Sequence, residues 1–320
     1  MKKIHILLVL LMVGIPAMEA QNYKMVLKKT DGTTHEFPVE EILEISMEEI
    51  VPDLPLRVIV SENEMIDLSA SAKSKRIKAR APITTTSTLT SFAMHGNNYD
   101  YYLTKESSQW KATPDYWPKD VSVDTDVKFY AHSAGDYYSD SNGQYIQFSV
   151  VDNPANQHDL LVATKTTSYN ASNGAVNLTF DHACTAVEFN VCMTSKLKTE
   201  LGDHRLTVKR IELKDVYNSG EYYFDDDSWR NLTTKYDANH NAIYTLTNSD
   251  INVSTELTHL PCEYLFMIPQ TTEGSARLEV NYTIDSSESK TATIPISNIS
   301  WDAGCKYTMN IKLNTSMIEL

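Results

Sequence analysis

The sequence predicts an all-β protein with two antiparallel β-sandwich domains in series, and three observations support this. Apolar and polar residues alternate with a period of two in many short runs, as in strands with one buried face. Turn signals such as Asn173-Gly174 separate these runs. The chain also has 18 tyrosines against 8 Phe and 4 Trp, and aromatic residues favour strands. The clearest run lies near the C-terminus, with apolar positions at Tyr307, Met309, Ile311 and Leu313.

Length and composition limit the number of domains and the kinds of partner. With 320 residues, 42% of them hydrophobic, the chain is long enough for two domains with real cores. The formal net charge of −14 argues against binding to nucleic acid and to anionic membrane surfaces. We expect neither as a partner.

Residues 1–20 have the pattern of a secretory signal peptide. A basic start, Met1-Lys2-Lys3, precedes a short apolar run and then small residues. The run is too short to span a bilayer comfortably, and we expect no transmembrane segment in the mature chain. Cleavage is expected between Ala20 and Gln21, with Ala17 as the alternative.

The signal region contains no cysteine that could be acylated, since the first cysteine of the chain is Cys184. We therefore expect export to the cell surface, a pilus or the outer membrane without a lipoprotein anchor.

Residues 21–50 are predicted to form a small β-hairpin unit, because Thr30-Asp31-Gly32-Thr33 is a strong turn signal. Residues 51–80 look like a connector or pro-segment. Within it, Leu56 to Val60 could form one strand.

A basic run from Lys73 to Arg80 closes the connector. It is either a solvated linker or a processing site for a trypsin-like protease, because exposed basic linkers are where proteases cut. In the second case Arg76 and Arg80 are the cleavage residues and Ala81 begins the mature chain.

The two sandwiches are placed at residues 81–196 and 197–320. The first contains seven strand-like runs with turn signals between them, which is typical of a sandwich. In the second, a change of parity near Lys209-Arg210 predicts a β-bulge. Ser195 to Leu201 could form a short helix. The seven runs are 88–94, 99–103, 127–132, 145–150, 159–163, 176–180 and 186–191.

The cysteines give no metal site. Cys184, Cys192, Cys262 and Cys305 lack the paired spacing of zinc ligands. Cys184 and Cys192 would lie ~26 Å apart on one strand at ~3.3 Å per residue, so they cannot bridge each other. Either could bridge to Cys262 or Cys305 in an exported protein, or all could stay free.

No catalytic constellation is evident, so we expect neither an enzyme nor a cofactor. His182 follows Asp181, but no nucleophile motif accompanies them, which favours a structural histidine bonded to the backbone. The run Asp225-Asp226-Asp227 could offer oxygens to calcium but lacks the spacing of a known loop, so a solvated loop is preferred. A glycosidase-type carboxylate pair is not favoured by any feature.

An aromatic cluster is the one candidate ligand site. Its members could stack on a sugar, with Tyr101, Trp110 and Trp117 as the platform, or they could be core residues. The cluster consists of Tyr99, Tyr101, Tyr102, Trp110, Tyr116 and Trp117.

A series of segments between residues 80 and 313 resembles the fimbrillins, the subunits of type V pili of Gram-negative anaerobes. They include Tyr116-Trp117-Pro118, Ile268-Pro269-Gln270 and, near the end, Trp301-Asp302-Ala303-Gly304. The resemblance implies two transthyretin-like β-sandwich domains. It also implies removal of an N-terminal segment by cleavage after arginine, and polymerisation in which a strand of one subunit fills a groove in the next.

The resemblance leads to a functional hypothesis, a structural or adhesive subunit that assembles by β-strand addition with other fimbrillin subunits or with itself. Leu56 to Val60, or Met65 to Ala70, would be the strand that fills the groove before assembly. The alternative is a stand-alone surface module that binds a host or bacterial glycan or protein.

Overall fold

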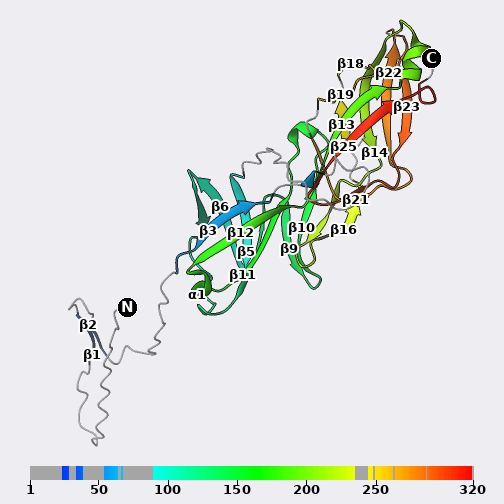
Figure 1. Ribbon diagram of the computed structural model, residues 1–320. Helices are drawn as coiled ribbons and strands as arrows, with labels where there is room; N and C mark the ends of the chain where they lie inside the picture. The colour runs from blue at the N-terminus through cyan, green and yellow to red at the C-terminus, as the bar shows by residue number, and fades with distance from the viewer. Residues whose placement is uncertain are drawn as a thin grey trace, which may run out of the picture. The chain divides into compact units, whose positions relative to one another are not determined.

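The computed structural model (Figure 1) describes residues 24–28, 34–38, 54–63, 66–67, 89–234, 244–247, 249–261, 264–285 and 287–318. Its contacts divide the chain into two units, residues 1–52 and 53–320. Ala20, Gln21, Arg76, Arg80 and Ala81 lie outside the described residues. Among those that are described, no helix is long and apolar enough to cross a membrane.

The small unit contains a β-hairpin. Strands β1 (Lys24–Lys28) and β2 (Thr34–Pro38) run antiparallel, in register from Lys24 opposite Pro38 to Lys28 opposite Thr34. They flank the residues that carry the Asp31-Gly32 turn signal. The pairing lies where the sequence placed a hairpin, while the extent of the unit at residues 21–50 stays a prediction.

The large unit begins with a closed ring of seven strands in the order β11-β12-β3-β7-β6-β5-β8. Neighbours are antiparallel except β3 and β12, which are parallel. We call this ring the barrel. Its strands are β3 (Arg57–Glu62), β5 (Ser91–Gly96), β6 (Tyr99–Glu106), β7 (Gln109–Thr113), β8 (Val127–His132), β11 (Leu161–Thr167) and β12 (Ala175–His182).

The barrel has its own hydrophobic core. Alternate residues of its strands point inward, and the largest of them are almost fully buried. The short helix α1 (Tyr169–Ser172) precedes β12 and begins at Ser168, whose hydroxyl caps it. The largest inward side chains of the strands are Tyr101, Phe92, Phe129, Phe180, Met94 and Leu103.

A second core lies under three further sheets. The first joins β13 (Thr185–Met193) in parallel to β25 (Cys305–Leu313), with β4 (Ile66–Asp67), β19 (Thr258–His259) and β20 (Leu265–Met267) along its edges. The second contains β14 (Leu206–Lys214), β17 (Tyr244–Thr247), β18 (Ile251–Asn252), β22 (Arg277–Ile284) and β23 (Lys290–Pro295). A two-stranded piece pairs β21 (Gln270–Thr271) with β24 (Ser300–Trp301).

The third sheet has the order β16-β15-β10-β9 and draws on both halves of the chain. Ile146 and Phe148 of β10 belong to the second core, although they precede residue 197. The strand pairing therefore crosses the division at residues 196 and 197 expected from the sequence. The sheet's strands are β9 (Asp136–Asp140), β10 (Gly143–Ser149), β15 (Ser219–Tyr223) and β16 (Ser228–Thr233), and the turn η2 (Pro154–Asn156) follows β10.

Several local predictions are confirmed. The register of β14 against β22 shifts between Val208 and Arg210, where the parity change predicted a bulge. The helix α2 (Ser195–Leu201) forms, capped by the Thr194 hydroxyl. Strand β25 is built into the second core, with Ile311 and Leu313 buried. The all-β class and the seven predicted runs of residues 81–196 are confirmed as well.

Candidate functional site

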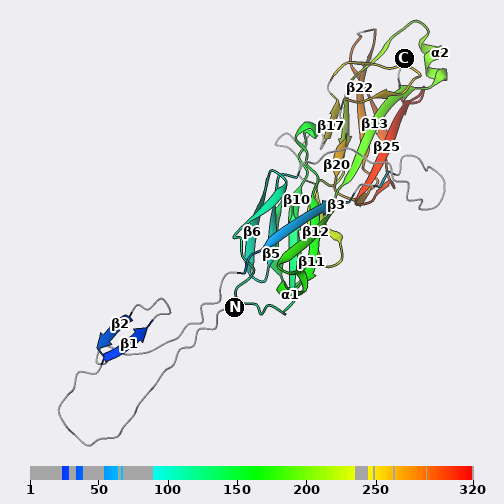
Figure 2. The ribbon, with the colours of Figure 1, turned by 60° about the vertical axis from the view of Figure 1, so that its left-hand side comes forward.

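Strand β3 fills a slot in the barrel between β12 and β7. It pairs with β12 over six positions, from Arg57 opposite Ala175 to Glu62 opposite Phe180. Toward β7 the contact is shorter, with one strand pair, Val58 opposite Trp110. Figures 1 and 2 show β3, in blue, beside the green β12. A segment expected to be a connector is thus a barrel strand, and the barrel begins well before residue 81.

Two backbone hydrogen bonds extend the attachment ahead of the strand. The Leu56 amide donates to the carbonyl of Asp115 over 3.0 Å, and the Trp117 amide donates to the carbonyl of Leu54 over 2.7 Å. Together with the two strand partners, they place β3 between hydrogen-bonding edges on both sides. A strand in this slot can therefore form backbone hydrogen bonds on both of its sides.

The side chains of β3 alternate as its position requires. Leu56 and Val58 are buried in the barrel core, and Val60 packs partly against it. Ile59 points outward and is 54% exposed. Full burial of a Val or Leu side chain stabilises by roughly 1.5–3 kcal/mol. The slot thus holds the apolar side chains at every second position of β3.

The far end of β3 is held by polar contacts. The Asn63 amide donates to the Phe180 carbonyl over 2.8 Å, and the Asn63 side chain donates to Asp181 over 2.6 Å. The carboxylate of Glu62 lies 3.5 Å from His182 Nε2. The end of β3 is therefore tied to the end of β12 by side chains as well as by backbone.

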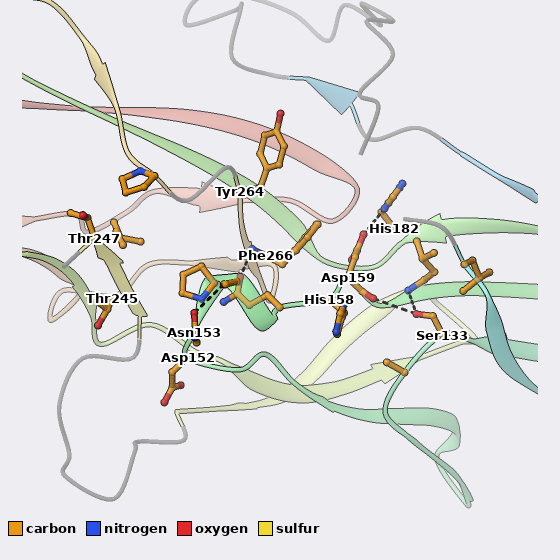
Figure 3. Close-up of a pocket in the computed structure, with 18 of the residues that line it drawn as sticks. Ser133, Asp152, Asn153, His158, Asp159, His182, Thr245, Thr247, Tyr264 and Phe266 are labelled. Atoms are coloured by element: carbon orange, nitrogen blue, oxygen red, sulfur yellow. Dashed lines mark hydrogen bonds and ion pairs between the residues drawn. The ribbon is translucent and has the colours of Figure 1, made fainter. Parts of the chain in front are cut away.

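His182 is buried between two carboxylates. Its Nδ1 hydrogen-bonds to Asp159 Oδ2, and Asp159 Oδ1 accepts from the Cys184 amide over 3.2 Å. The His182 and Asp159 side chains are 8% and 4% exposed. Burial lowers the pKa of His182, but its hydrogen bond to Asp159 and the charges of Asp159 and Glu62 outweigh burial and raise it. The site favours a cationic histidine. Figure 3 shows His182 and Asp159 turned toward each other.

The histidine was expected to bond to the backbone. It has a backbone hydrogen bond to Asn63, and the structure adds a side-chain partner in Asp159. The neighbouring Asp181 faces Asn63 instead. Asp159 precedes β11 and Glu62 belongs to β3, so both come from segments far from His182 in the sequence. Spacing gives no signal for either partner, because only the folded barrel brings them together.

A cavity of about 1250 Å³ opens beside this site. Ser133, Asp159 and His182 line one part of it, and Thr245 and Tyr264 line another. The Ser133 hydroxyl donates to the Asp159 carbonyl and accepts from the Leu161 amide, while His182 Nε2 faces Glu62. Serine, histidine and aspartate are thus present without the geometry of a catalytic triad.

The predicted aromatic platform needs correction. Tyr101 and Trp117 are 2% and 1% exposed, so their faces are covered by the barrel core and are not available to a sugar. Trp110 is half-buried and packs its edge against Phe92, with ring centroids 4.9 Å apart. Tyr101 shares parity with the buried Leu103, which is why it points inward.

The other candidate groups are structural. Cys184, Cys192 and Cys305 are free and buried, and Cys262 lies outside the described residues. In the acidic run, Asp225 accepts from Lys128, Asp226 pairs with Arg230, and Asp227 accepts from Tyr222. No cluster of His, Cys, Asp or Glu in the described part of the chain could hold a metal ion.

The chain has structural relatives at low sequence identity. A fimbrial protein from Bacteroides vulgatus is 21% identical, with a TM-score of 0.49 over 81% of this chain and 95% of that one. A proposed cell adhesion protein from Parabacteroides distasonis is 8% identical, with a TM-score of 0.50 over 83% and 90%. This second likeness supports the fold. No curated protein matches the sequence.

A family model settles the relationship. The model described as fimbrillin-like matches residues 62–320, which is well over half of the chain, and its match starts at the last residue of β3. The resemblance stated from sequence segments is therefore confirmed, and the chain belongs to the fimbrillin-like family.

Proposed function

We propose that this chain is an exported cell-surface subunit of a pilus or adhesive fibre, and that it assembles by exchange of β3 for a strand of another subunit. The observation that carries the proposal is the place of β3. It is one of the seven strands of a closed ring, with a neighbour on each side, yet it comes from the segment that precedes the basic run ending at Arg80. Cutting that run would leave β3 held only by non-covalent contacts.

The physical consequence of losing β3 supports this role. Backbone groups of β12 and β7 would lose their partners, and the pockets of Leu56 and Val58 would open. Unpaired strand edges with apolar pockets bind extended chains strongly, through backbone hydrogen bonds for affinity and alternate side chains for register. Other fimbrillin subunits, or further copies of this chain, are the proposed partners.

The remaining parts of the proposal follow the family. Two separate hydrophobic cores support two transthyretin-like domains in series, with β12 and β13 at the passage between them. The role is structural rather than catalytic. The alternative, a stand-alone glycan-binding module, loses its support because Tyr101 and Trp117 are buried.

Replacing both Arg76 and Arg80 with alanine tests the proposal. The variant should fold and be exported but fail to form oligomers, because no protease that cuts after arginine can free β3. The matched control is Lys73→Ala with Lys75→Ala, which removes the same charge from the same run and should still be processed. Detergent-stable ladders, filaments in electron microscopy and N-terminal sequencing are the readouts.

Two results would contradict the proposal. One is ladder formation by the doubly substituted arginine variant at the wild-type level. The other is processed, folded protein that stays monomeric at high concentration and also when mixed with partner subunits. In that case glycan binding by the monomer becomes the next measurement.

A further inference from the structure

We propose that His182, held by Asp159, selects the strand that enters the barrel slot by requiring a carboxylate at the position now occupied by Glu62. This inference rests on the proposed strand exchange. The partner is thus an extended strand with three apolar residues at alternating positions and an acidic residue two positions after the third.

The first step concerns four residues, in and just before β3, that share one face of the strand. Leu56, Val58, Val60 and Glu62 lie at alternating positions, so their side chains leave the same face of the strand. The first three enter the barrel core, and the fourth reaches the end of β12 beside His182. A replacement strand in the same register places its seventh residue, counted from the Leu56 position, next to His182 Nε2.

The bonding of Asp159 carries the second step. One of its carboxylate oxygens accepts from His182 Nδ1 and the other accepts from the Cys184 amide. Its peptide carbonyl accepts from the hydroxyl of Ser133, the residue that follows β8. Asp159 therefore fixes the ring and stabilises its charge but does not reach Nε2. The ring also has a backbone hydrogen bond to Asn63, which any strand in this register would supply, so what the incoming strand adds through its side chain is a second carboxylate beside Nε2.

Comparing residue types shows the resulting preference. An acidic residue supplies an ion pair to a largely buried cation, whereas an amide supplies only a neutral acceptor. An apolar residue takes away the second counter-charge of the buried cation, and Lys or Arg places like charges together. The charged groups facing His182 are Asp159 and Glu62, while Asp181 is bonded to Asn63.

The preference depends on pH in a defined direction. Because Asp159 and Glu62 raise the pKa of His182 against the effect of its burial, the folded protein binds the proton more tightly than the unfolded chain. The contribution is therefore complete below about pH 6.5 and is lost as the pH rises through the raised pKa. A strand with an acidic seventh residue is favoured most in mildly acidic surroundings.

The test is a strand-exchange measurement on the full chain. A site-specific protease sequence replaces residues 75–80, the folded protein is cut in place, and labelled peptides spanning residues 54–63 compete for the slot. The peptides carry Glu, Gln or Lys at position 62. A control peptide exchanges Ser61 with Glu62, which keeps composition and charge but turns the acid to the opposite face.

At about pH 6 the Glu peptide should bind about tenfold more tightly than the Gln peptide, a difference typical of a partly buried charged pair. The Lys and exchanged peptides should bind more weakly than the Glu peptide. The difference between Glu and Gln should shrink at about pH 9, and His182→Gln should remove it at both values. Equal binding of Glu and Gln peptides at pH 6, or a preference that survives His182→Gln, would overturn the inference.

A second measurement separates this inference from the proposed function. If no peptide enters the slot, strand exchange is wrong. The interaction between Glu62 and His182 can then still be measured in the uncut protein. The unfolding constant is measured at both pH values for the wild type, for Glu62→Gln, for His182→Gln and for the double variant. The inference requires that the two substitutions are non-additive by a few-fold in the unfolding constant at pH 6 but additive at pH 9. Additivity at both values overturns it.

Discussion

Strands β3 and β25 pair with their neighbours in a similar way, but we expect their removal to have different effects on the protein. Each lies parallel to one of two consecutive strands, β3 along β12 over six positions and β25 along β13 over eight. Strand β3 sits inside a closed ring with β7 on its other flank. On its other flank, β25 meets β4 at two positions, Cys305 and Lys306.

Their side chains differ as well. Strand β25 places Ile311 and Leu313 in the second core, and the chain continues to Ile318, which is also buried there. Strand β3 contributes Leu56 and Val58 to the barrel and leaves Ile59 exposed. Removing β25 takes fully buried side chains from the second core and leaves only the two-residue strand β4 on its far flank, whereas removing β3 takes two side chains from the barrel and leaves two strands of the ring, β12 and β7, without their partner. We expect a strand to be replaceable when the neighbouring strands keep their place after its removal, so that another strand can pair with them.

The largest effect is expected from deletion of residues 306–320. The second core loses several fully buried side chains, each worth roughly 1.5–3 kcal/mol, against a total stability of roughly 5–15 kcal/mol for a domain. We expect loss of its cooperative unfolding and of amide protection in β22. Deletion of residues 1–63 should leave β22 protected and expose β12. Persistent protection of β22 without β25 would erase the distinction between the two strands.

Single side chains should show the same contrast at a smaller scale. Leu313→Ala should cost about 2–5 kcal/mol of global stability, because Leu313 is 0% exposed in the second core. Val58→Ala should cost about 1–2 kcal/mol and increase hydrogen exchange mainly in β12 and β7. Ile59→Ala, on the exposed face of β3, is the matched control and should change little. A global loss from Val58→Ala equal to that from Leu313→Ala would contradict the comparison.

The sequence was most informative where a strand has one dry and one wet face. Alternation located β22 and β25, and a break in parity located the bulge between Val208 and Arg210. It also marked Leu56 to Val60 as a possible strand. It could not assign that strand to the barrel, because its partner β12 lies more than a hundred residues away and parallel pairing leaves no local signal.

The candidate site was harder to predict. His182 stood out from the sequence, but Asp159 and Glu62 did not, since each approaches it from a different segment. The aromatic cluster was misleading because density of Tyr and Trp says nothing about the face they occupy. Parity with Leu103 carries that information for Tyr101, and only the barrel core explains the burial of Trp117.

The smallest expected effect is a weakening of the barrel in acid, and it rests on His132 at the end of β8. Burial lowers the pKa of His132 to about 4, with the neighbouring His95 adding to the shift and the Ala134 carbonyl and Asp136 opposing it. His132 Nδ1 bonds to that carbonyl over 2.9 Å, and its Nε2 lies 3.0 Å from His95 Nε2. The other ring nitrogen of His95, Nδ1, lies 2.7 Å from Asp100 Oδ1. Tyr137 stacks on His95 from β9.

The direction follows from the depressed pKa. Below about pH 6.5 the unfolded chain binds a proton at His132 that the folded barrel excludes down to about pH 4, so stability falls across that window as the pH falls. At about pH 5.5 the loss should be about 1 kcal/mol. His132→Asn keeps a polar group near the Ala134 carbonyl and should flatten this part of the dependence of Tm on pH. His182 contributes with the opposite sign, but its contribution is complete below about pH 6.5 and changes only above that pH, so the variant is compared with the wild type on each side of it. An unchanged slope in His132→Asn would show that another group causes the acid sensitivity.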